Sequence, residues 1–365
     1  MIEVNGNYGE GGGQIVRTAL ALSTLMQKPF RAYDIRKERK EPGLKNQHLY
    51  CIDALRKICD AKTDAAELGS EKIIYAPSAI KQSNIEVDIG TAGSITLFLQ
   101  SVMFPLMFAG KRSKITVRGG TDTKWSPSFD YLNYVMMPHL RKFADIELSI
   151  LKRGFYPKGG GIVELKMKPF MDISGYENFG EFVSEARKKF KPIIIEEQGN
   201  LLAIKGVSHA SEELREAKVA ERQSSYSSSI LTKNFNINPY IRVEYSKTYS
   251  IGSVMTLWAA FAKKDETGMD NPIIIGADSL GEKGKKAEDV GKDAASSLIK
   301  EVDSRCAVDK YLGDMLLPYM AVVGGKIKVS GITNHTLSNI YAIELFFGKM
   351  FEIDEKENKI SCRVS

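Results

Sequence analysis

The sequence predicts an α/β protein that is built from three repeated α/β units and a smaller inserted α/β domain. Three observations support this prediction. A strand, a glycine turn and a helix open the chain; the same pattern returns at a nearly constant spacing; and one long segment breaks that spacing. Three similar units packed together are the most economical architecture for such a pattern.

The first unit begins with a short alternating stretch at residues 2–4, and four glycines follow within residues 9–13. Glycine loses the most backbone freedom on ordering, so this run predicts a turn. A helix is expected next, because apolar residues recur at the spacing of one buried face: Ile15, Ala19, Leu22 and Met26. The unit continues with a strand over 30–36, a helix over 44–58 and a returning strand over 72–75.

The pattern then repeats twice. Ile15 and Ile95 are 80 positions apart, and Ile35 and Val117 are 82 apart, so two units keep nearly one period. The second unit is expected to contain a strand at 85–89, a turn at 90–94, a helix at 95–108, a strand at 114–118, a turn at 119–122 and a helix at 129–143. The third is expected to contain a helix at 311–320, a strand at 327–329, a turn at 331–334, a helix at 336–347 and a closing hairpin of 351–353 with 360–363.

The segment 181–305 breaks the period and is interpreted as an inserted domain. Its expected elements are strands at 192–196, 201–207, 240–245 and 272–275 and a polar, serine-rich helix at 212–233. Residues 1–180 and 306–365 then form the repeat-built catalytic domain.

Composition limits the function classes. The chain has 365 residues and a net charge of +6, which is compatible with an RNA or nucleotide partner without requiring one. The cysteines form no CxxC pair, which favours structural thiols in a reducing compartment. The longest apolar stretch, 102–109, is too short to cross a membrane, and Met1 leads straight into a polar strand. We therefore expect a soluble, cytoplasmic protein without a membrane partner.

The glycine turn at residues 9–14 places bare backbone before a helix N-terminus, where unpaired N–H groups and the helix dipole favour an anion. A tight turn that binds nothing is the alternative, since the spacing matches neither common phosphate-binding motif. Glu10 is unusual in a turn that cradles phosphates. A carboxylate is expected in such a turn mainly where a divalent cation lies between it and the phosphates.

Four histidines are candidates for chemistry. His335 follows a strand and a turn at the start of a helix, which we interpret as the same local geometry as that of Glu10. A neutral imidazole there could attack phosphorus, although a satisfied turn residue is the alternative. His48 could be either packed or substrate-facing. His139 is expected at the surface or as a capping residue, and His209 lies in the insert.

Arginines complete the candidate site. Arg17 lies one helical turn beyond the glycine run, and Arg36 and Arg39 follow the neighbouring strand. Guanidinium groups offer bidentate contacts to phosphate oxygens. A solvated charge run is the better interpretation for Lys37 and Lys40. Arg17 lies in an otherwise apolar helix, so it needs a partner to offset its burial.

Several blocks together resemble the RNA 3′-terminal phosphate cyclases. The run 9–17 resembles the N-terminal signature of that family. Further matches, in chain order, are 42–44 with 47–48, 66–70, 90–94 with Gln100, 119–122, 154–157 with 159–161, and 311–314. The resemblance spans almost the whole chain and is weakest in the insert.

The resemblance implies a fold akin to that of the enolpyruvyl transferases. It also implies ATP as a substrate, Mg²⁺ or Mn²⁺ as a cofactor, and conversion of an RNA 3′-phosphate into a 2′,3′-cyclic phosphate. His335 would be the nucleophile that takes AMP, and Glu10 a metal ligand. The nucleotide would be held by Gln100, Pro127, Tyr311, Leu312, Gly313, Asp314 and Met315. Phosphates of ATP or RNA would be held by Arg17, Arg36, Arg39 and Gln47.

One position departs from the expected pattern: residue 315 is Met where a polar Gln is expected. Two other functions also fit parts of the sequence. A non-catalytic relative acts in ribosome assembly as a binding protein, but such sequences lack the nucleophilic histidine. The enolpyruvyl transferases share the repeat but neither the insert nor these blocks. A homodimer is left open.

Overall fold

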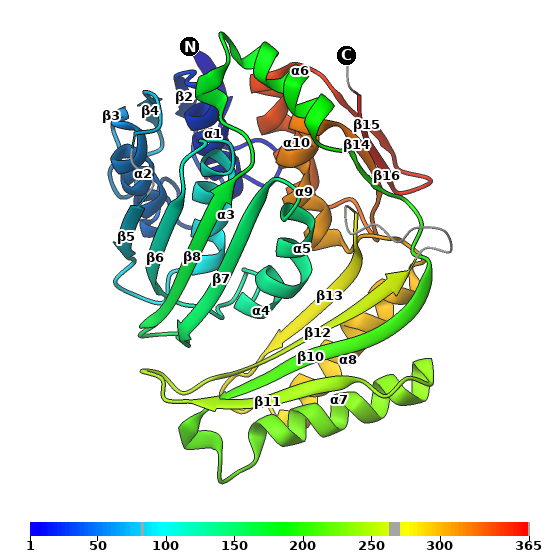
Figure 1. The fold of residues 1–365 in the computed structure, drawn as a ribbon. Helices are drawn as coiled ribbons and strands as arrows, with labels where there is room; N and C mark the ends of the chain where they lie inside the picture. Colours follow the sequence, from blue (N-terminus) through cyan, green and yellow to red (C-terminus); the bar gives the residue numbers. More distant parts are fainter. Residues whose placement is uncertain (82–83, 263–270, 364–365) are drawn as a thin grey trace.

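The computed structural model describes residues 1–81, 84–262 and 271–363 (Figure 1). Strands and helices alternate along the chain, which confirms the predicted α/β class. The described strands form four sheets of four strands each. Three of these sheets share one topology and define the repeated units, and the fourth belongs to the insert.

The first unit has the strand order β1-β2-β4-β3, in which β1 and β2 are parallel and the other neighbours antiparallel. Its strands are β1 (Ile2–Asn5), β2 (Phe30–Tyr33), β3 (Lys62–Asp64) and β4 (Ile73–Ala76), and its helices are α1 (Gly13–Met26) and α2 (Asn46–Cys59). Only the short edge strand β3 was not expected, because three mostly exposed polar residues carry no apolar pattern.

The second unit repeats this order as β5-β6-β8-β7. Its strands are β5 (Asn84–Asp88), β6 (Ser113–Gly119), β7 (Ala144–Lys152) and β8 (Gly161–Pro169), and its first helix is α3 (Ile95–Leu106). The helix expected over 129–143 consists of α4 (Phe129–Tyr131), a π-helical turn (Leu132–Met136) and α5 (Met137–Leu140). The π-turn precedes Pro138, a residue that cannot donate a backbone hydrogen bond.

The third unit repeats the order again as β9-β14-β16-β15. Its elements are β9 (Ile193–Ile195), α9 (Lys310–Val323), β14 (Gly325–Lys328), α10 (Asn334–Phe347), β15 (Phe351–Asp354) and β16 (Lys359–Cys362), and α6 (Phe179–Lys189) precedes β9. The prediction that the strand at 192–196 belongs to the insert is wrong, because β9 pairs in parallel with β14. A short apolar run does not reveal which sheet it will join.

The insert therefore enters between the first strand and the first helix of the third unit. Its sheet has the order β11-β10-β12-β13, and two helices, α7 and α8, cover one face of it (Figure 1). The elements are β10 (Asn200–Ser211), a short 3₁₀ turn (Glu212–Leu214), α7 (Val219–Phe235), β11 (Tyr240–Ser246), β12 (Ser253–Ala262), β13 (Ile273–Leu280) and α8 (Ala287–Asp303). The helix expected over 212–233 thus begins later, at Val219.

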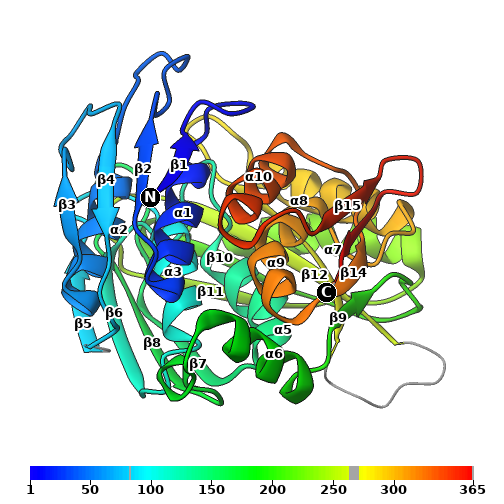
Figure 2. The same ribbon diagram turned by 90° about the horizontal axis from the view of Figure 1, so that it is seen from above.

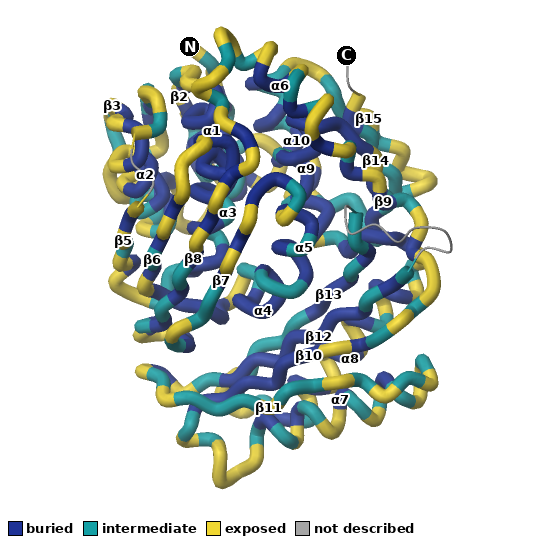
Figure 3. Tube along the Cα trace, viewed as in Figure 1, coloured by how far each residue is buried: buried dark blue, intermediate teal, exposed yellow. Residues whose placement is uncertain are grey.

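The helices of the three units pack against one another between the sheets, so that α1 contacts α3 and α10, and α9 contacts α10 (Figure 2). These helices are largely buried (Figure 3). Aromatic rings join the second and third units, with Phe104 and Tyr319 in an edge-to-face contact at 5.1 Å between centroids. His139 was expected at the surface or as a capping residue, and the surface prediction is wrong. Its side chain is buried, and burial lowers its pKa to about 3.

The insert is joined to the units through the loop and turn around α4. The Ser128 backbone N–H donates to Asp278 Oδ2 at 2.8 Å, and its hydroxyl lies 2.8 Å from that of Thr256. Tyr134 stacks on Trp258 with centroids 4.6 Å apart. No helix within the described residues has both the length and the apolar composition of a membrane span. The four cysteines are buried free thiols.

Candidate active site

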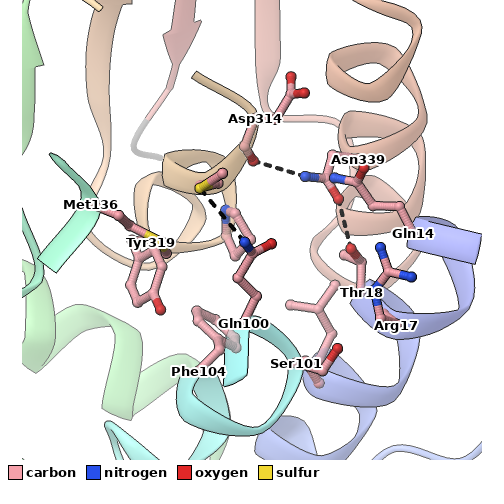
Figure 4. A pocket seen from close by; sticks show the side chains of 14 residues that line it. Gln14, Arg17, Thr18, Gln100, Ser101, Phe104, Met136, Asp314, Tyr319 and Asn339 are labelled. Carbon is pink, nitrogen blue, oxygen red and sulfur yellow. Dashed lines mark hydrogen bonds between the residues drawn. The ribbon is translucent and has the colours of Figure 1, made fainter. Parts of the chain in front are cut away.

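A cleft of about 630 Å³ lies where the units meet the insert. Helices α1, α3 and α9 contribute Arg17, Gln100 and Asp314 to its wall, and His335 stands at the start of α10. The loop before α4 contributes Pro127. Figure 4 shows Arg17, Gln100 and Asp314 around a smaller cavity of about 50 Å³ that shares these three residues with the cleft.

A capping box orders the N-terminus of α10 and so fixes the backbone that carries His335. The Thr333 hydroxyl accepts from the Thr336 N–H at 3.0 Å, and the Thr336 hydroxyl accepts from the Thr333 N–H at 3.0 Å. Asp314 of α9 accepts hydrogen bonds from both hydroxyls, with the Thr333 contact at 3.2 Å. Burial raises the pKa of the Asp314 carboxyl to about 7. Asp314 therefore ties α9 to the turn that positions His335.

A second connection joins the same helices to α1. The Asn339 side chain donates to the Asp314 backbone carbonyl at 2.8 Å and accepts from the Thr18 hydroxyl at 2.6 Å (Figure 4). Thr18 is the neighbour of Arg17, so these hydrogen bonds fix α1, α9 and α10 relative to one another around the cleft.

The fold corrects the comparison between His335 and Glu10. His335 is the second residue of α10, which is the second helix of its unit, whereas Glu10 precedes the first helix of its own unit. The residue equivalent to His335 in the first unit is Gln47, the second residue of α2. The two local patterns look alike in sequence because both are strand, turn and helix.

Glu10 and His335 nevertheless lie close together, because α1 packs against α10. The Asn334 amide donates to Glu10 Oε1 at 2.6 Å, and Arg39 lies 3.5 Å from Glu10 Oε2. The Asn334 hydrogen bond lowers the pKa of Glu10. Burial lowers the pKa of His335, and Arg17 and Arg39 act in the same direction while Glu10 opposes them. The lowered pKa favours the neutral form of the His335 imidazole, and Arg17 and Arg39 supply positive charge near it.

The arginines occupy distinct positions. Arg17 lines the cleft, burial lowers its pKa, and within the described residues it has no carboxylate partner. Arg36 and Arg39 do not line the cleft; they lie in the loop beside Glu10. Arg36 Nε is buried without a hydrogen-bond partner among the described residues. Such unsatisfied donors are costly, and an anion would relieve the cost.

The predicted nucleotide residues divide into two groups. Gln100, Tyr311 and Met315 line the cleft together with Pro127 and Asp314, and Gln100 Nε2 lies 3.7 Å from the Met315 sulfur. Two others do not reach it: the side chain of Leu312 is wholly buried in the core, and Gly313 packs against Val329. Leu312 and Gly313 therefore lie on the face of α9 that packs into the core, and not on the face that lines the cleft.

The two positions at the start of α2 also lie outside the cleft. Gln47 is half-buried and does not line it. Of the two alternatives for His48, packed or substrate-facing, the structure supports the packed one. Its side chain is fully buried against Gly13, Nδ1 accepts from the Lys45 N–H at 2.9 Å, and burial lowers its pKa well below the usual value.

The sequence reasoning missed one wall of the cleft. Trp125 is 94% exposed at its rim, and the end of β13 adds Ser279 and Leu280, followed by Lys285. A tryptophan in the turn before Pro127 was a signal that could have been used. The residues of the insert gave none, because they are about 150 positions from that turn in sequence and reach it only through the tertiary fold.

Comparisons with known proteins agree with this architecture. The chain matches the family model described as RNA 3′-terminal phosphate cyclase over residues 8–353. It is 42% identical to the protein of that name from Pyrococcus furiosus, covering 97% of this chain and 95% of the relative. The protein of the same name from Archaeoglobus fulgidus is 40% identical, with 97% and 98% covered. The chain belongs to the RNA 3′-terminal phosphate cyclase family.

Proposed function

We propose that this protein is an ATP-dependent ligase that converts an RNA 3′-terminal phosphate into a 2′,3′-cyclic phosphate through a covalent histidine–AMP intermediate. The observation that carries the proposal is the position of His335. It is a neutral imidazole at the rim of the cleft, close to Glu10 and with Arg17 on the same cleft wall. The names of the relatives support the overall reaction.

The proposed reaction has three steps. An imidazole nitrogen of His335 attacks the α-phosphorus of ATP, a P–N bond forms, and pyrophosphate leaves. An oxygen of the RNA 3′-phosphate then takes AMP from His335, which frees the imidazole. The adjacent 2′-hydroxyl attacks the activated phosphorus, loses its proton and expels AMP. This last attack is intramolecular and has a good leaving group, so it needs no strong base.

Arg17 is placed to stabilise the charge that develops on the transferring phosphoryl group. A divalent ion fits at Glu10 only if the substrate supplies most of its ligands, because the described residues contain no cluster of three potential ligands. Mg²⁺ is commonly held by one or two carboxylates plus substrate phosphates. When bound, it would neutralise phosphate charge. The residues present therefore fit a metal that arrives with ATP.

Replacing Glu10 tests this role of the carboxylate. In Glu10→Gln, adenylylation should need a higher Mg²⁺ or Mn²⁺ concentration while metal-free RNA binding stays nearly unchanged. The acidic limb of its pH profile should also move to lower pH, because the negative charge of Glu10 raises the pKa of His335. Single-turnover adenylylation, titrated with metal and with pH, measures both. An unchanged metal titration would show that Glu10 is structural.

Trp125 tests where the nucleotide base lies. Trp125, Tyr131 and Tyr311 bring aromatic rings to the cleft, and base–aromatic stacking is worth about 1–3 kcal/mol. Trp125→Ala should therefore raise the KM for ATP roughly tenfold with kcat little changed, and Trp125→Phe should remain near wild type. ATP should also quench Trp125 fluorescence, whereas Trp258 is buried against Tyr134. An unchanged KM for ATP in Trp125→Ala would place the base elsewhere.

A direct assay separates this function from that of a non-catalytic RNA-binding relative. The protein is incubated with ATP, Mg²⁺ and an RNA that carries a labelled 3′-phosphate. We expect the label to become resistant to phosphatase, with AMP and pyrophosphate formed in equal amounts. An RNA that ends in a 3′-hydroxyl should consume no ATP beyond one self-adenylylation. A label that stays phosphatase-sensitive would favour the binding protein.

A further inference from the structure

Two loops meet beside the cleft and share an unusual composition. Residues 153–160 connect β7 to β8, and residues 247–252 connect β11 to β12 of the insert (Figure 1). Neither loop contains an acidic residue. Together with the end of β7 they carry the exposed Leu151, Tyr156, Lys158, Tyr249 and Ile251 and the half-buried Lys152, which we call the Tyr–Lys patch.

The patch is held rigidly. Lys152 Nζ lies 3.5 Å from the centre of the Tyr249 ring, and the Lys158 N–H donates to the Ser250 hydroxyl at 3.0 Å. Gly160 has a positive φ and contacts Tyr249 so closely that a Cβ would lie 2.1 Å from the ring. The Tyr249 ring is thus presented in a fixed position although it is 62% exposed, and Tyr156 beside it is 77% exposed. Preordered side chains lose little entropy on binding.

The patch is connected to the wall of the cleft. Phe155 pairs with Asp122, and the next residue, Thr123, lines the cleft. On the other side, Gly159 contacts Thr91 in the turn before α3. The route that connects the cleft wall to the patch therefore runs through the buried 119–123 turn. The glycine-rich segment 154–161, which takes no part in the cleft, builds this route.

The chemistry of the patch selects its partner. Exposed aromatic rings offer stacking platforms to bases, and lysines without acidic neighbours attract a phosphate backbone. Lys247 extends the positive charge; it lies near Glu212, whose own charge is compensated by Arg215 at 2.5 Å.

We propose that the Tyr–Lys patch binds the single-stranded body of the RNA substrate, upstream of the 3′-phosphate, by stacking bases on Tyr156 and Tyr249. This inference rests on the proposed function for the identity of the substrate. It assigns a role to the loop 247–252: the insert presents half of an RNA platform.

The test measures binding without catalysis. The whole protein is titrated with a single strand of about 16 nucleotides that ends in a 3′-hydroxyl, without ATP. Tyr249→Ala and Tyr156→Ala should each weaken affinity roughly tenfold, and Tyr249→Phe should keep it. Lys158→Ala should lower the slope of log affinity against log salt by about 0.7.

The matched control is the double variant Lys205→Ala/Tyr240→Ala. Lys205 and Tyr240 are exposed and paired in register at the other end of β10 and β11, so the control removes one ring and one charge outside the patch. Its RNA affinity should equal that of the wild type. Unchanged affinity in Tyr249→Ala and Tyr156→Ala, or an equal loss in the control, overturns the proposal.

Self-adenylylation by ATP is measured on the same variants and reports on the cleft separately. If RNA binding depends on the patch but the protein does not adenylylate itself, the proposed function is refuted and this inference stands. If adenylylation is normal but the patch variants bind RNA as the wild type does, this inference is refuted and the proposed function stands.

Discussion

His335→Ala abolishes covalent labelling by α-labelled ATP and reduces cyclisation to the detection limit; this is the largest effect that we expect from any single substitution. Loss of the attacking group in a covalent enzyme costs on the order of 10⁶ in rate. His335 lies at a helix N-terminus whose capping box is made by Thr333 and Thr336, so its removal leaves the cap intact. The melting temperature should stay close to that of the wild type.

A buried histidine outside the cleft provides the control. His209 lies in β10, where Nε2 lies 2.8 Å from the Ser246 hydroxyl, and burial lowers its pKa to about 3. His209→Ala should lower the melting temperature while leaving adenylylation per folded molecule intact. Undiminished labelling in folded His335→Ala would show that another group takes AMP.

Arg153→Ala destabilises the protein by about 3–5 kcal/mol, which is the largest stability effect that we expect. Arg153 is buried between two carboxylates, with its guanidinium nitrogens 3.2 Å from Asp122 and 2.6 Å from Asp130. Those carboxylates raise the pKa of Arg153 against the opposing effect of burial. Removing the guanidinium leaves two buried carboxylates facing each other. Chemical denaturation followed by circular dichroism measures the loss.

An exposed lysine gives the comparison. Lys166 pairs with the half-buried Glu164 of β8 at 3.1 Å, and Lys114 also pairs with Glu164 at 2.9 Å, so that Lys166→Ala leaves the carboxylate paired. Exposed pairs contribute about 0–1 kcal/mol, so Lys166→Ala should change the free energy of unfolding by no more than that. Equal changes in the free energy of unfolding for Arg153→Ala and Lys166→Ala would contradict a stabilising role for the buried cluster of Arg153, Asp122 and Asp130.

The periodic parts of the fold could be predicted from sequence because apolar spacing directly reports a buried helix face. Helices α1, α2 and α3 follow from it within a few residues. The pairing of β9 could not be predicted. Ile193–Ile195 is apolar throughout, and only its register with Gly325 shows that the third unit begins before the insert. Sequence order therefore misplaced a strand whose partner is more than 100 residues away.

The candidate site divides in the same way. His335, Arg17 and Gln100 could be named because motifs and the resemblance point to them, and the fold brings all three to one cleft. Trp125 could have been named from the turn before Pro127, whereas Lys285 could not, because its side of the wall exists only where the insert docks on the second unit. His139 shows the opposite failure: a polar residue beside a proline suggested exposure, but its side chain is buried.

The central claim is that His335 carries AMP, and mapping the modified residue tests it most directly. The protein is incubated with α-labelled ATP and Mg²⁺, digested, and the labelled peptide is sequenced by mass spectrometry. The account predicts one labelled site, at His335, with a bond that acid cleaves and alkali does not, and release of the label on addition of RNA that ends in a 3′-phosphate. A label on another residue, or cyclisation without any labelled protein, would contradict it.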